Sequence, residues 1–444
     1  MDIMDLVVSK FGGTSLASSE NFLKVKDIIQ SQTNRRYIVA SAPGKVKKED
    51  TKITDLLYLC YDLANHKIAY MDILEKIYDK YNEIVKGAKV DIDLKKYIDE
   101  LDYALKSEKS KDFIASRGEY INAIILSKLL GYEFVDAKEI IFFDENGNLD
   151  EEKSYKKIYE MSKEIERAVI PGFYGIKPNG EIKTFSRGGG DLTGSIVARG
   201  VETSLYENWT DVSGFLSADP RIVDNPKQIE MVTYKELREL SYAGASVLHE
   251  ESILPLTSHG IPIEIKNTFR PEDKGTRIVS DEEFENLNRT NKTITGVAGK
   301  KHFSVINIEK TRLNSDKSFH RKLMSVLEVN GVSLEHMPSS IDSVSLIVKD
   351  KDISADIDTV ISEIKTFCSP DKISVKHSIA LITVVGICMK SHIGISAKLF
   401  KALADSNINI QMIIQGSSEV NIIIGIDEKD YENAIRSIYK AFIN

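Results

Sequence analysis

The 444-residue chain lacks the sequence features of a secreted protein, of a protein stabilised by a zinc site and of a membrane protein. Its three cysteines are scattered and form no C-x-x-C pair, so neither a zinc site nor a redox motif is indicated. So sparse a count is typical of a reducing compartment. The N-terminus has no basic segment followed by a long apolar run, and no apolar run approaches the ~20 residues of a membrane span. We therefore expect a cytoplasmic protein without membrane association.

An excess of positive charge is also missing. The 59 Lys and Arg residues are outnumbered by 67 Asp and Glu residues, which gives a formal net charge of −8. A nucleic-acid surface usually requires clustered basic residues without this acidic balance, so no nucleic-acid partner is expected. The hydrophobic content of 42% is ordinary for a globular protein, and the length predicts two or three domains.

The first forty residues have the pattern of a strand, a glycine turn, a helix and a second strand. The apolar run 6–11 ends at two glycines, Ser18 or Ser19 can cap the helix, and residues 37–40 form the next strand. Strands that alternate with helices predict an α/β fold with a mostly parallel sheet between layers of helices.

Further along, residues from about 53 to 131 are mainly helical in pattern, and residues 168–280 return to alternating strands and helices. Residues 281–292 are polar and charge-rich, which is typical of a linker. We therefore predict one domain over residues 1–292 and a second region over 293–444.

The second region contains an internal repeat. A shift of 76 positions matches the apolar pattern of two segments without a gap. The matched stretches include 303–308 with 379–384, 321–337 with 397–413 and 343–348 with 419–424. Each copy has the pattern strand, helix, strand, strand, with room for a further helix and strand. Two unrelated α/β segments of similar period are the alternative explanation.

The chain has neither the G-x-x-x-x-G-K-[ST] loop nor the H-R-D and D-F-G motifs, so any phosphate site must be built differently. Two glycine-rich turns are the candidates. The first is 10–15 (KFGGTS), where Gly12 and Gly13 allow backbone N–H groups to approach an anion and Lys10 supplies a charge. The alternative is an ordinary strand-to-helix turn.

The second turn is 186–193 (SRGGGDLT), which precedes an apolar helix. Arg187 offers a planar donor fork to a carboxylate or phosphate, and Asp191 is able to orient Lys10. The alternative is a tight turn with a surface ion pair.

Two more motifs carry polar residues. Glu119 in 116–119 (SRGE) lies next to a helix predicted over 120–130, where it either complements the helix dipole or holds a substrate ammonium. In 209–214 (WTDVSG), Trp209 is expected in the core, and the residues that follow it lie where α/β sheets bind ligands.

Together these motifs resemble the amino-acid kinase family, and within it the aspartate kinases. KFGGTS, SRGE, SRGGGD and WTDVSG with DPR at 219–221 occur in that family's order, and the resemblance spans essentially the whole chain. The repeated unit resembles the ACT domain, a βαββαβ module that often binds amino acids between paired copies. The resemblance implies an amino-acid kinase fold followed by tandem ACT-like regulatory domains.

The resemblance also implies roles for individual residues. It implies that Lys10 neutralises the transferring phosphoryl group, Asp191 positions Lys10, and Arg187 grips the substrate α-carboxylate. The implied substrate-binding residues are Ser41, Thr54, Glu119, Phe185 and Arg187. The implied ATP-binding residues are Lys10, Gly12, Gly13, Thr210, Asp211 and Arg221.

The implied reaction is transfer of the ATP γ-phosphate to the β-carboxylate of L-aspartate, the first step toward lysine, threonine and methionine. Mg²⁺ is expected to be held by ATP oxygens and water, without a dedicated protein metal site. An end-product amino acid, lysine first and threonine second, is expected to act at the ACT-like domains through positions such as Asn307, His336 and Ser340. Paired ACT domains imply a homodimer or homotetramer.

Two positions depart from the family pattern in the implied nucleotide pocket. Leu216 stands where the family commonly has Tyr, and Ser246 where it commonly has Lys; Lys266 is a candidate to compensate. The departures leave open a non-catalytic amino-acid sensor of this fold. A kinase acting on glutamate or acetylglutamate is the other alternative, and SRGE together with the repeated unit argues against it.

Overall fold

The computed structural model describes residues 6–47, 49–186, 188–245, 248, 250–287, 293–353 and 356–443. It divides into two compact units. The first takes the described residues of Met1–Phe215, Gln228–Leu237 and Ser246–Asn288, and the second those of Leu216–Lys227, Arg238–Ala245 and Arg289–Asn444. The division by function at residue 292 stays a prediction.

The first unit is built on an eight-stranded sheet of order β3-β4-β2-β1-β7-β9-β10-β8. Every neighbouring pair is parallel except β9 with β10, which confirms the predicted mostly parallel sheet. The strands are β1 (Val7–Phe11), β2 (Arg35–Ala40), β3 (Glu133–Phe134), β4 (Ala168–Pro171), β7 (Leu205–Thr210), β8 (Met231–Thr233), β9 (Ile263–Asn267) and β10 (Thr276–Val279). A separate hairpin pairs β5 (Tyr174–Ile176) with β6 (Ile182–Thr184).

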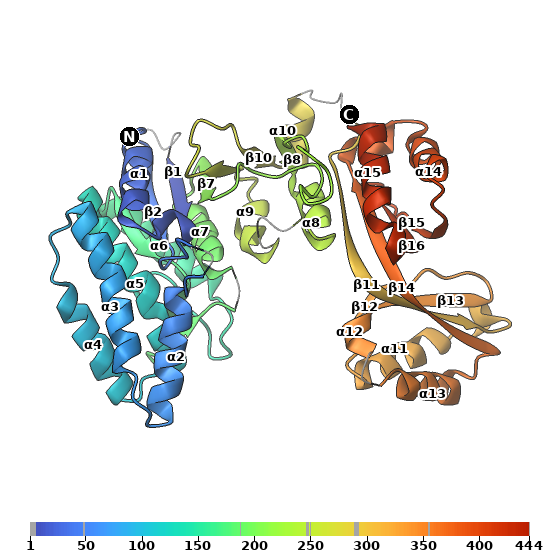
Figure 1. Cartoon of the computed structure of the whole chain (residues 1–444), viewed down its shortest axis with the longest axis horizontal. Helices are drawn as coiled ribbons and strands as arrows, with labels where there is room; N and C mark the ends of the chain where they lie inside the picture. The colour runs from blue at the N-terminus through green and yellow to red at the C-terminus, as the bar shows by residue number, and fades with distance from the viewer. Residues whose placement is uncertain are drawn as a thin grey trace. The chain divides into compact units, whose positions relative to one another are not determined.

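Helices cover both faces of this sheet (Figure 1). On one face, α5 packs on β2 and β4 over a core that includes Phe11 and Trp209. On the other face, α7 packs on β1, β2 and β7, with α6 beside it. The helices are α1 (Ser19–Gln30), α2 (Ile53–Asn65), α3 (Met71–Ala88), α4 (Leu94–Lys106), α5 (Lys111–Leu130), α6 (Glu151–Glu164), α7 (Gly189–Gly200), α8 (Tyr234–Tyr242), α9 (Leu254–Thr257) and α10 (Asp281–Asn286). Ser18 caps α1 by accepting the Asn21 N–H, as one of the two predicted caps.

The beginning of α5 differs from the prediction. Ser110 caps the helix, which therefore begins nine residues before the predicted start at residue 120. Glycine is favoured at position 118 inside the helix because a larger residue would press on the loop after β2. A Cβ at Gly118 would lie 3.0 Å from the Cβ of Ala42. Glu119 is consequently in the middle of a buried helix, so the helix-dipole explanation for it is wrong.

The predicted linker is partly helical. Residues 281–286 form α10, because Ser280 accepts the Glu283 N–H as an N-cap and Phe284 is buried. Residues 288–292 lie outside the described part of the chain.

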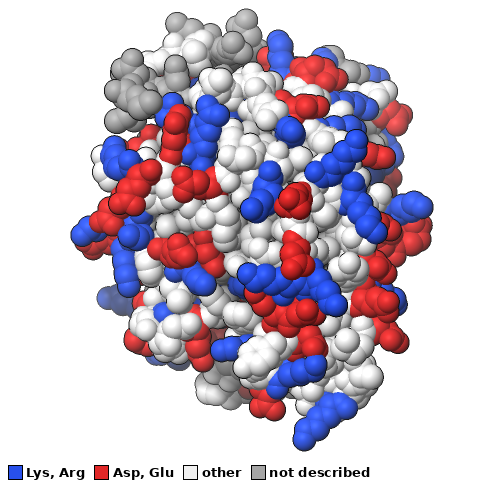
Figure 2. All heavy atoms as spheres, turned by 90° about the vertical axis from the view of Figure 1, so that its left-hand side faces the viewer, with Lys and Arg blue, Asp and Glu red and all other residues white. Residues whose placement is uncertain are grey.

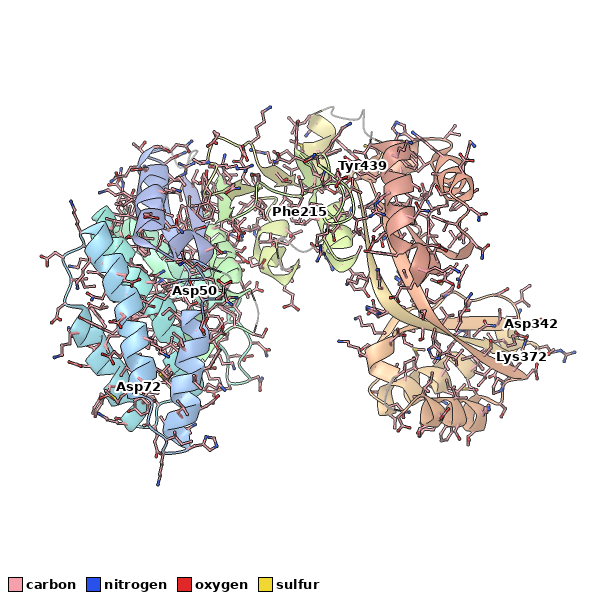
Figure 3. The ribbon with its side chains drawn as sticks, in the orientation of Figure 1. Asp50, Asp72, Phe215, Asp342, Lys372 and Tyr439 are labelled. Atoms are coloured by element: carbon pink, nitrogen blue, oxygen red, sulfur yellow. The ribbon has the colours of Figure 1, made fainter. Side chains whose placement is uncertain are left out.

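The second unit confirms the predicted repeat. Its six-stranded antiparallel sheet has the order β12-β13-β11-β14-β16-β15, and β11, α11 and β12 return 76 residues later as β14, α14 and β15. Figure 3 labels Lys372 at the start of β14 and Tyr439 in α15. The elements are β11 (Gly296–Glu309), α11 (Phe319–Val329), β12 (Leu334–His336), β13 (Ser343–Lys349), α12 (Asp350–Ile353), α13 (Ile357–Cys368), β14 (Lys372–Val385), α14 (Ile395–Asp405), β15 (Ile410–Ile414), β16 (Asn421–Asp427) and α15 (Tyr431–Phe442).

The last strand of each copy is not always where the pattern predicts it. Residues 303–309 pair with the first half of β14, which closes the first copy as predicted. Residues 296–300 pair with the second half of β14, so the closing strand of the second copy precedes the first copy in the chain. Long strands that serve both copies join them in one sheet.

Figure 2 shows basic and acidic side chains interspersed over the face that it presents. No helix among the described residues combines the length and apolar character that a membrane crossing requires.

We predict that Gly194→Ala destabilises the first unit, because a Cβ at this position of α7 would lie 2.3 Å from the Tyr206 hydroxyl oxygen. Overpacking of this kind costs about 1–3 kcal/mol. Gly416→Ala is the matched control, since its Cβ would meet only Ser418 Oγ at 3.9 Å. Urea unfolding should show a lower midpoint for Gly194→Ala alone; equal midpoints would contradict the packing of α7 on β7.

Candidate active site

The candidate site lies where the central parallel strands end. Lys10 is in register with Val39 of β2 on one side and with Asn208 of β7 on the other. The loops that leave β1, β2 and β7 therefore meet at one edge of the sheet, which is where open α/β sheets bind ligands.

An ion pair joins the two glycine-rich turns. The Nζ of Lys10 lies 2.5 Å from Oδ1 of Asp191 in the first turn of α7, and both side chains are largely buried. The same oxygen accepts a hydrogen bond of 2.8 Å from Nδ2 of Asn208, and the Asp191 carbonyl accepts one of 3.3 Å from the Tyr206 hydroxyl. The two turns thus converge as the sequence predicted.

Glycine residues, which have no side chain, make this close approach of the two turns possible. A Cβ on Gly190 would lie 2.8 Å from Ser41 Oγ and 3.5 Å from Cε of Lys10. A Cβ on Gly13 would lie 2.9 Å from the Ala42 carbonyl oxygen. Larger residues at either position would push the loops away from the sheet edge.

The two predicted phosphate-loop glycines differ in what their amides offer. The Gly12 N–H already donates to the Trp209 carbonyl at 3.0 Å and is not available to a ligand. The N–H groups of Gly13 and Thr14 have no acceptor among the described residues. The Gly12 N–H is occupied because the sheet extends one residue past β1, and the predicted place of Gly12 and Gly13 in a phosphate loop stays a prediction.

Glu119 brings a buried carboxyl group with one unbonded oxygen to the same edge. It is 6% exposed, and its Oε2 has no hydrogen-bond partner among the described residues. Desolvation raises the pKa of Glu119 to about 8, against the smaller lowering effects of backbone N–H groups, including that of Ala42, and of Arg117. Asn122, one turn later, donates to the Ser41 carbonyl and leaves its own Oδ1 unpaired. Glu119 and Asn122 therefore both contact the loop that follows β2, and each keeps one buried acceptor atom unbonded.

The other predicted substrate residues have different positions. Ser41 directly follows β2 and is half-buried, and Thr54 is half-buried in the first turn of α2. Phe185 is buried with its ring 5.0 Å from that of Phe143. Arg187 lies outside the described residues, so its predicted contact with the α-carboxylate stays a prediction.

Two more of the predicted nucleotide residues, Thr210 and Asp211, are the last residue of β7 and the residue that follows it. The Thr210 carbonyl accepts the Thr268 N–H at 2.9 Å, and Asp211 is exposed. The Nζ of Lys266 on β9 lies 5.5 Å from the ring centroid of Trp209, which is itself in the core as predicted. This places Lys266 on the strand beside β7, with its ammonium near the same edge.

The structure does not test three positions of the implied nucleotide pocket. Arg221 and Leu216 belong to the second unit, where the Arg221 guanidinium makes several bonds to the Asp219 carboxylate. Ser246 lies outside the described residues. Their predicted effects on ATP binding stay predictions.

The predicted effector positions lie in the second unit. Asn307 and Ser340 line a hollow of about 640 Å³ on its sheet, whose wall is rich in serine and includes Ser345 and Lys376. His336 on β12 is not part of that wall; it is half-buried, and desolvation lowers its pKa.

The chain matches the model of the amino acid kinase family over residues 5–267 and an ACT domain model over residues 382–442. It is 38% identical to Aspartokinase 3 of Bacillus subtilis over 98% of each chain. The chain belongs to the aspartate kinases. The crystal structure of Clostridium acetobutylicum aspartate kinase is 52% identical, with a TM-score of 0.91 over 99% of this chain and all of that one. E. coli aspartokinase III shares the fold at 21% identity, with a TM-score of 0.75 over 99% of this chain and all of that one.

Sequence reasoning missed two polar residues at the site of this aspartate kinase. Asn208 precedes Trp209, and strand alternation on β7 would have placed it on the face of Lys10. Asn122 follows Glu119 by three residues, the spacing of neighbours on one face of a helix. Strand alternation could be used only with the correct bounds of β7, and the three-residue spacing only with the correct bounds of α5.

We predict that Glu119→Gln stabilises the ligand-free enzyme increasingly as pH rises from 5 to 8. The folded state holds the Glu119 proton up to its raised pKa of about 8, whereas the unfolded state loses it near 4.5. Stability from this group is therefore lost as pH rises through that window, and Gln removes the loss. Each pKa unit corresponds to about 1.4 kcal/mol, so the two proteins should diverge by a few kcal/mol.

Urea unfolding at pH 5, 6.5 and 8 measures this divergence. Glu100→Gln on the exposed side of α4 is the control and should show little change with pH. A constant difference between Glu119→Gln and the parent protein would mean that the carboxyl group is ionised in the folded state.

Proposed function

We propose that this aspartate kinase transfers the γ-phosphate of ATP to the β-carboxylate of L-aspartate and forms 4-phospho-L-aspartate. The observation that carries the proposal is the Lys10–Asp191 ion pair at the sheet edge that also holds the unpaired Glu119 carboxyl. E. coli aspartokinase III, which shares the fold, has been solved in complex with aspartate and ADP.

The chemistry requires little beyond position and charge. The acceptor carboxylate is already ionised at pH 7, so no general base is needed. Phosphoryl transfer then depends on aligning the two substrates and stabilising the charge around the γ-phosphate. The Lys10 ammonium has three N–H donors, of which Asp191 occupies one. The others, with the N–H groups of Gly13 and Thr14, are suited to the phosphoryl oxygens.

The amino-acid head group is the natural partner of Glu119. A buried carboxyl with a pKa of about 8 is mainly protonated at pH 7, and a substrate ammonium beside it favours its ionised form. We propose that Glu119 binds the α-ammonium and Arg187 the α-carboxylate. Ser41, Thr54 and Phe185 would then border the side chain and select aspartate by length.

The nucleotide would extend past β7 along Thr210 and Asp211, with Lys266 as a candidate cation; the predicted ATP contact of Arg221 stays a prediction. Mg²⁺ would be carried by the triphosphate oxygens and water, because it gives up its water ligands reluctantly. Asp211 is the more accessible carboxylate of this edge, whereas Asp191 is already bonded to Lys10 and Asn208.

We further propose that the enzyme acts in the cytoplasm as a homodimer or homotetramer, at the first step toward lysine, threonine and methionine. An end-product amino acid would regulate it through the ACT-like copies. The hollow that contains Asn307 and Ser340 is the candidate effector site. One structure of E. coli aspartokinase III is a complex with lysine and aspartate in the T-state.

We predict that Lys10→Ala lowers kcat by about 10²-fold or more, since a preorganised charge at the transition state contributes roughly 3–4 kcal/mol. The KM for aspartate should change much less. A coupled assay for ADP formation with aspartate, and then with glutamate, measures both activity and substrate choice. Near-normal turnover of the variant would remove Lys10 from the mechanism, and equal use of glutamate would contradict the assigned substrate.

We predict that lysine or threonine inhibits the enzyme and that Asn307→Ala raises the inhibitory concentration about tenfold, equivalent to about 1.4 kcal/mol of binding energy. Uninhibited kcat should stay unchanged, because Asn307 lies in the second unit's own hollow. Ser325→Ala on the exposed side of α11 is the control. Activity that ignores both amino acids would contradict the regulatory proposal.

A further inference from the structure

The carboxylate that holds Lys10 is itself held from β7. Tyr206 and Asn208 are two residues apart on that strand and thus point to the same face. The Tyr206 hydroxyl donates to the backbone carbonyl of Asp191, while Nδ2 of Asn208 donates to Oδ1 of its side chain. Asn208 is 3% exposed, so it contacts Asp191 without lining the open part of the site.

Lys10 and Asn208 share one oxygen atom. The ammonium lies 2.5 Å from Oδ1 of Asp191, and the amide nitrogen of Asn208 lies 2.8 Å from the same atom. A neutral donor at this position fixes the rotation of the carboxylate without adding charge. If the amide were absent, the carboxylate would be free to turn and take a second N–H of Lys10. Those N–H groups would otherwise face the phosphoryl oxygens.

We propose that Asn208 is a positioning residue for phosphoryl transfer, which acts by holding Asp191 so that Lys10 presents its remaining N–H donors to the transferring group. The inference rests on the proposed role of Lys10. The described titratable groups that face the amide are Lys10 on β1, Asp191 on α7 and Tyr206 on β7. Burial raises the pKa of Tyr206 well above its usual value, so it stays neutral near pH 7. Glu207 belongs to the opposite face, where it bonds to Ser9.

The isosteric variant Asn208→Asp tests this role through pH. When the introduced carboxyl group is protonated, it donates an O–H to Asp191 in place of the amide. When it loses that proton, it repels Asp191 and competes for Lys10. Two carboxyl groups that share a site titrate with one strongly raised pKa, so the change should fall within the assay range.

We expect kcat of Asn208→Asp to be within about 3-fold of the parent enzyme at pH 6 and at least about 10-fold lower at pH 8.5, with the ratio rising steadily between them. The KM for aspartate should stay within about 2-fold. Tyr206→Phe is the control, because it removes a contact to the same residue without adding an ionisable group, and its ratio to the parent should not vary with pH. A ratio for Asn208→Asp that is flat with pH overturns the inference.

A second variant, Asn208→Ala, tests the same role if Asn208→Asp does not fold. Asn208→Ala adds no charge, and it should lower kcat about tenfold at every pH while leaving both KM values within about 2-fold. Unchanged kcat in a folded Asn208→Ala protein also overturns the inference. Lys10→Ala, assayed beside these, separates the two proposals. If it keeps its activity, the proposed mechanism fails, whereas if it is inactive and Asn208→Ala is normal, the role of Asn208 alone fails.

Discussion

The contact between Lys10 and Asp191 requires α7 and β7, which are consecutive elements, to close on β1, which is distant from both in sequence. The helix α7 must lie low enough over β1 and β7 for a short aspartate side chain to reach the Lys10 ammonium. Gly190 and Gly194 permit this, because a Cβ at either position would strike Ser41 or the Tyr206 hydroxyl. These two glycines therefore determine how closely α7 approaches the sheet, and that distance determines where the Asp191 carboxylate meets Lys10.

Polar groups buried at the sheet edge lower the stability of the empty enzyme. An unpaired carboxyl group is costly inside a protein, and Glu119 avoids part of that cost by staying protonated. The buried Glu207 of β7, by contrast, is fully engaged by Arg35, Trp209 and Ser9. Glu207 therefore ties β1, β2 and β7 together, while Glu119 and Asn122 on α5 each keep an acceptor atom unbonded.

The glycine turns, the parallel sheet and the 76-residue repeat were predictable because each depends on local backbone geometry or on periodicity. The start of α5 was not, since Gly118 in its interior looks like a helix break until Ala42 is seen to fill the space beside it. Asn208 was missed because its importance comes from a strand-to-helix contact that the sequence does not display. Arg187, a central part of the predicted site, lies outside the described residues.

The account depends on the γ-phosphate meeting Lys10 at the carboxyl ends of β1 and β7. A crystal structure of the enzyme with aspartate and a non-hydrolysable ATP analogue measures this directly. We predict that a γ-phosphate oxygen lies within hydrogen-bonding distance of Lys10 Nζ, and that the aspartate ammonium contacts Glu119. A γ-phosphate bound elsewhere, with Lys10 bonded only to Asp191, would contradict the account.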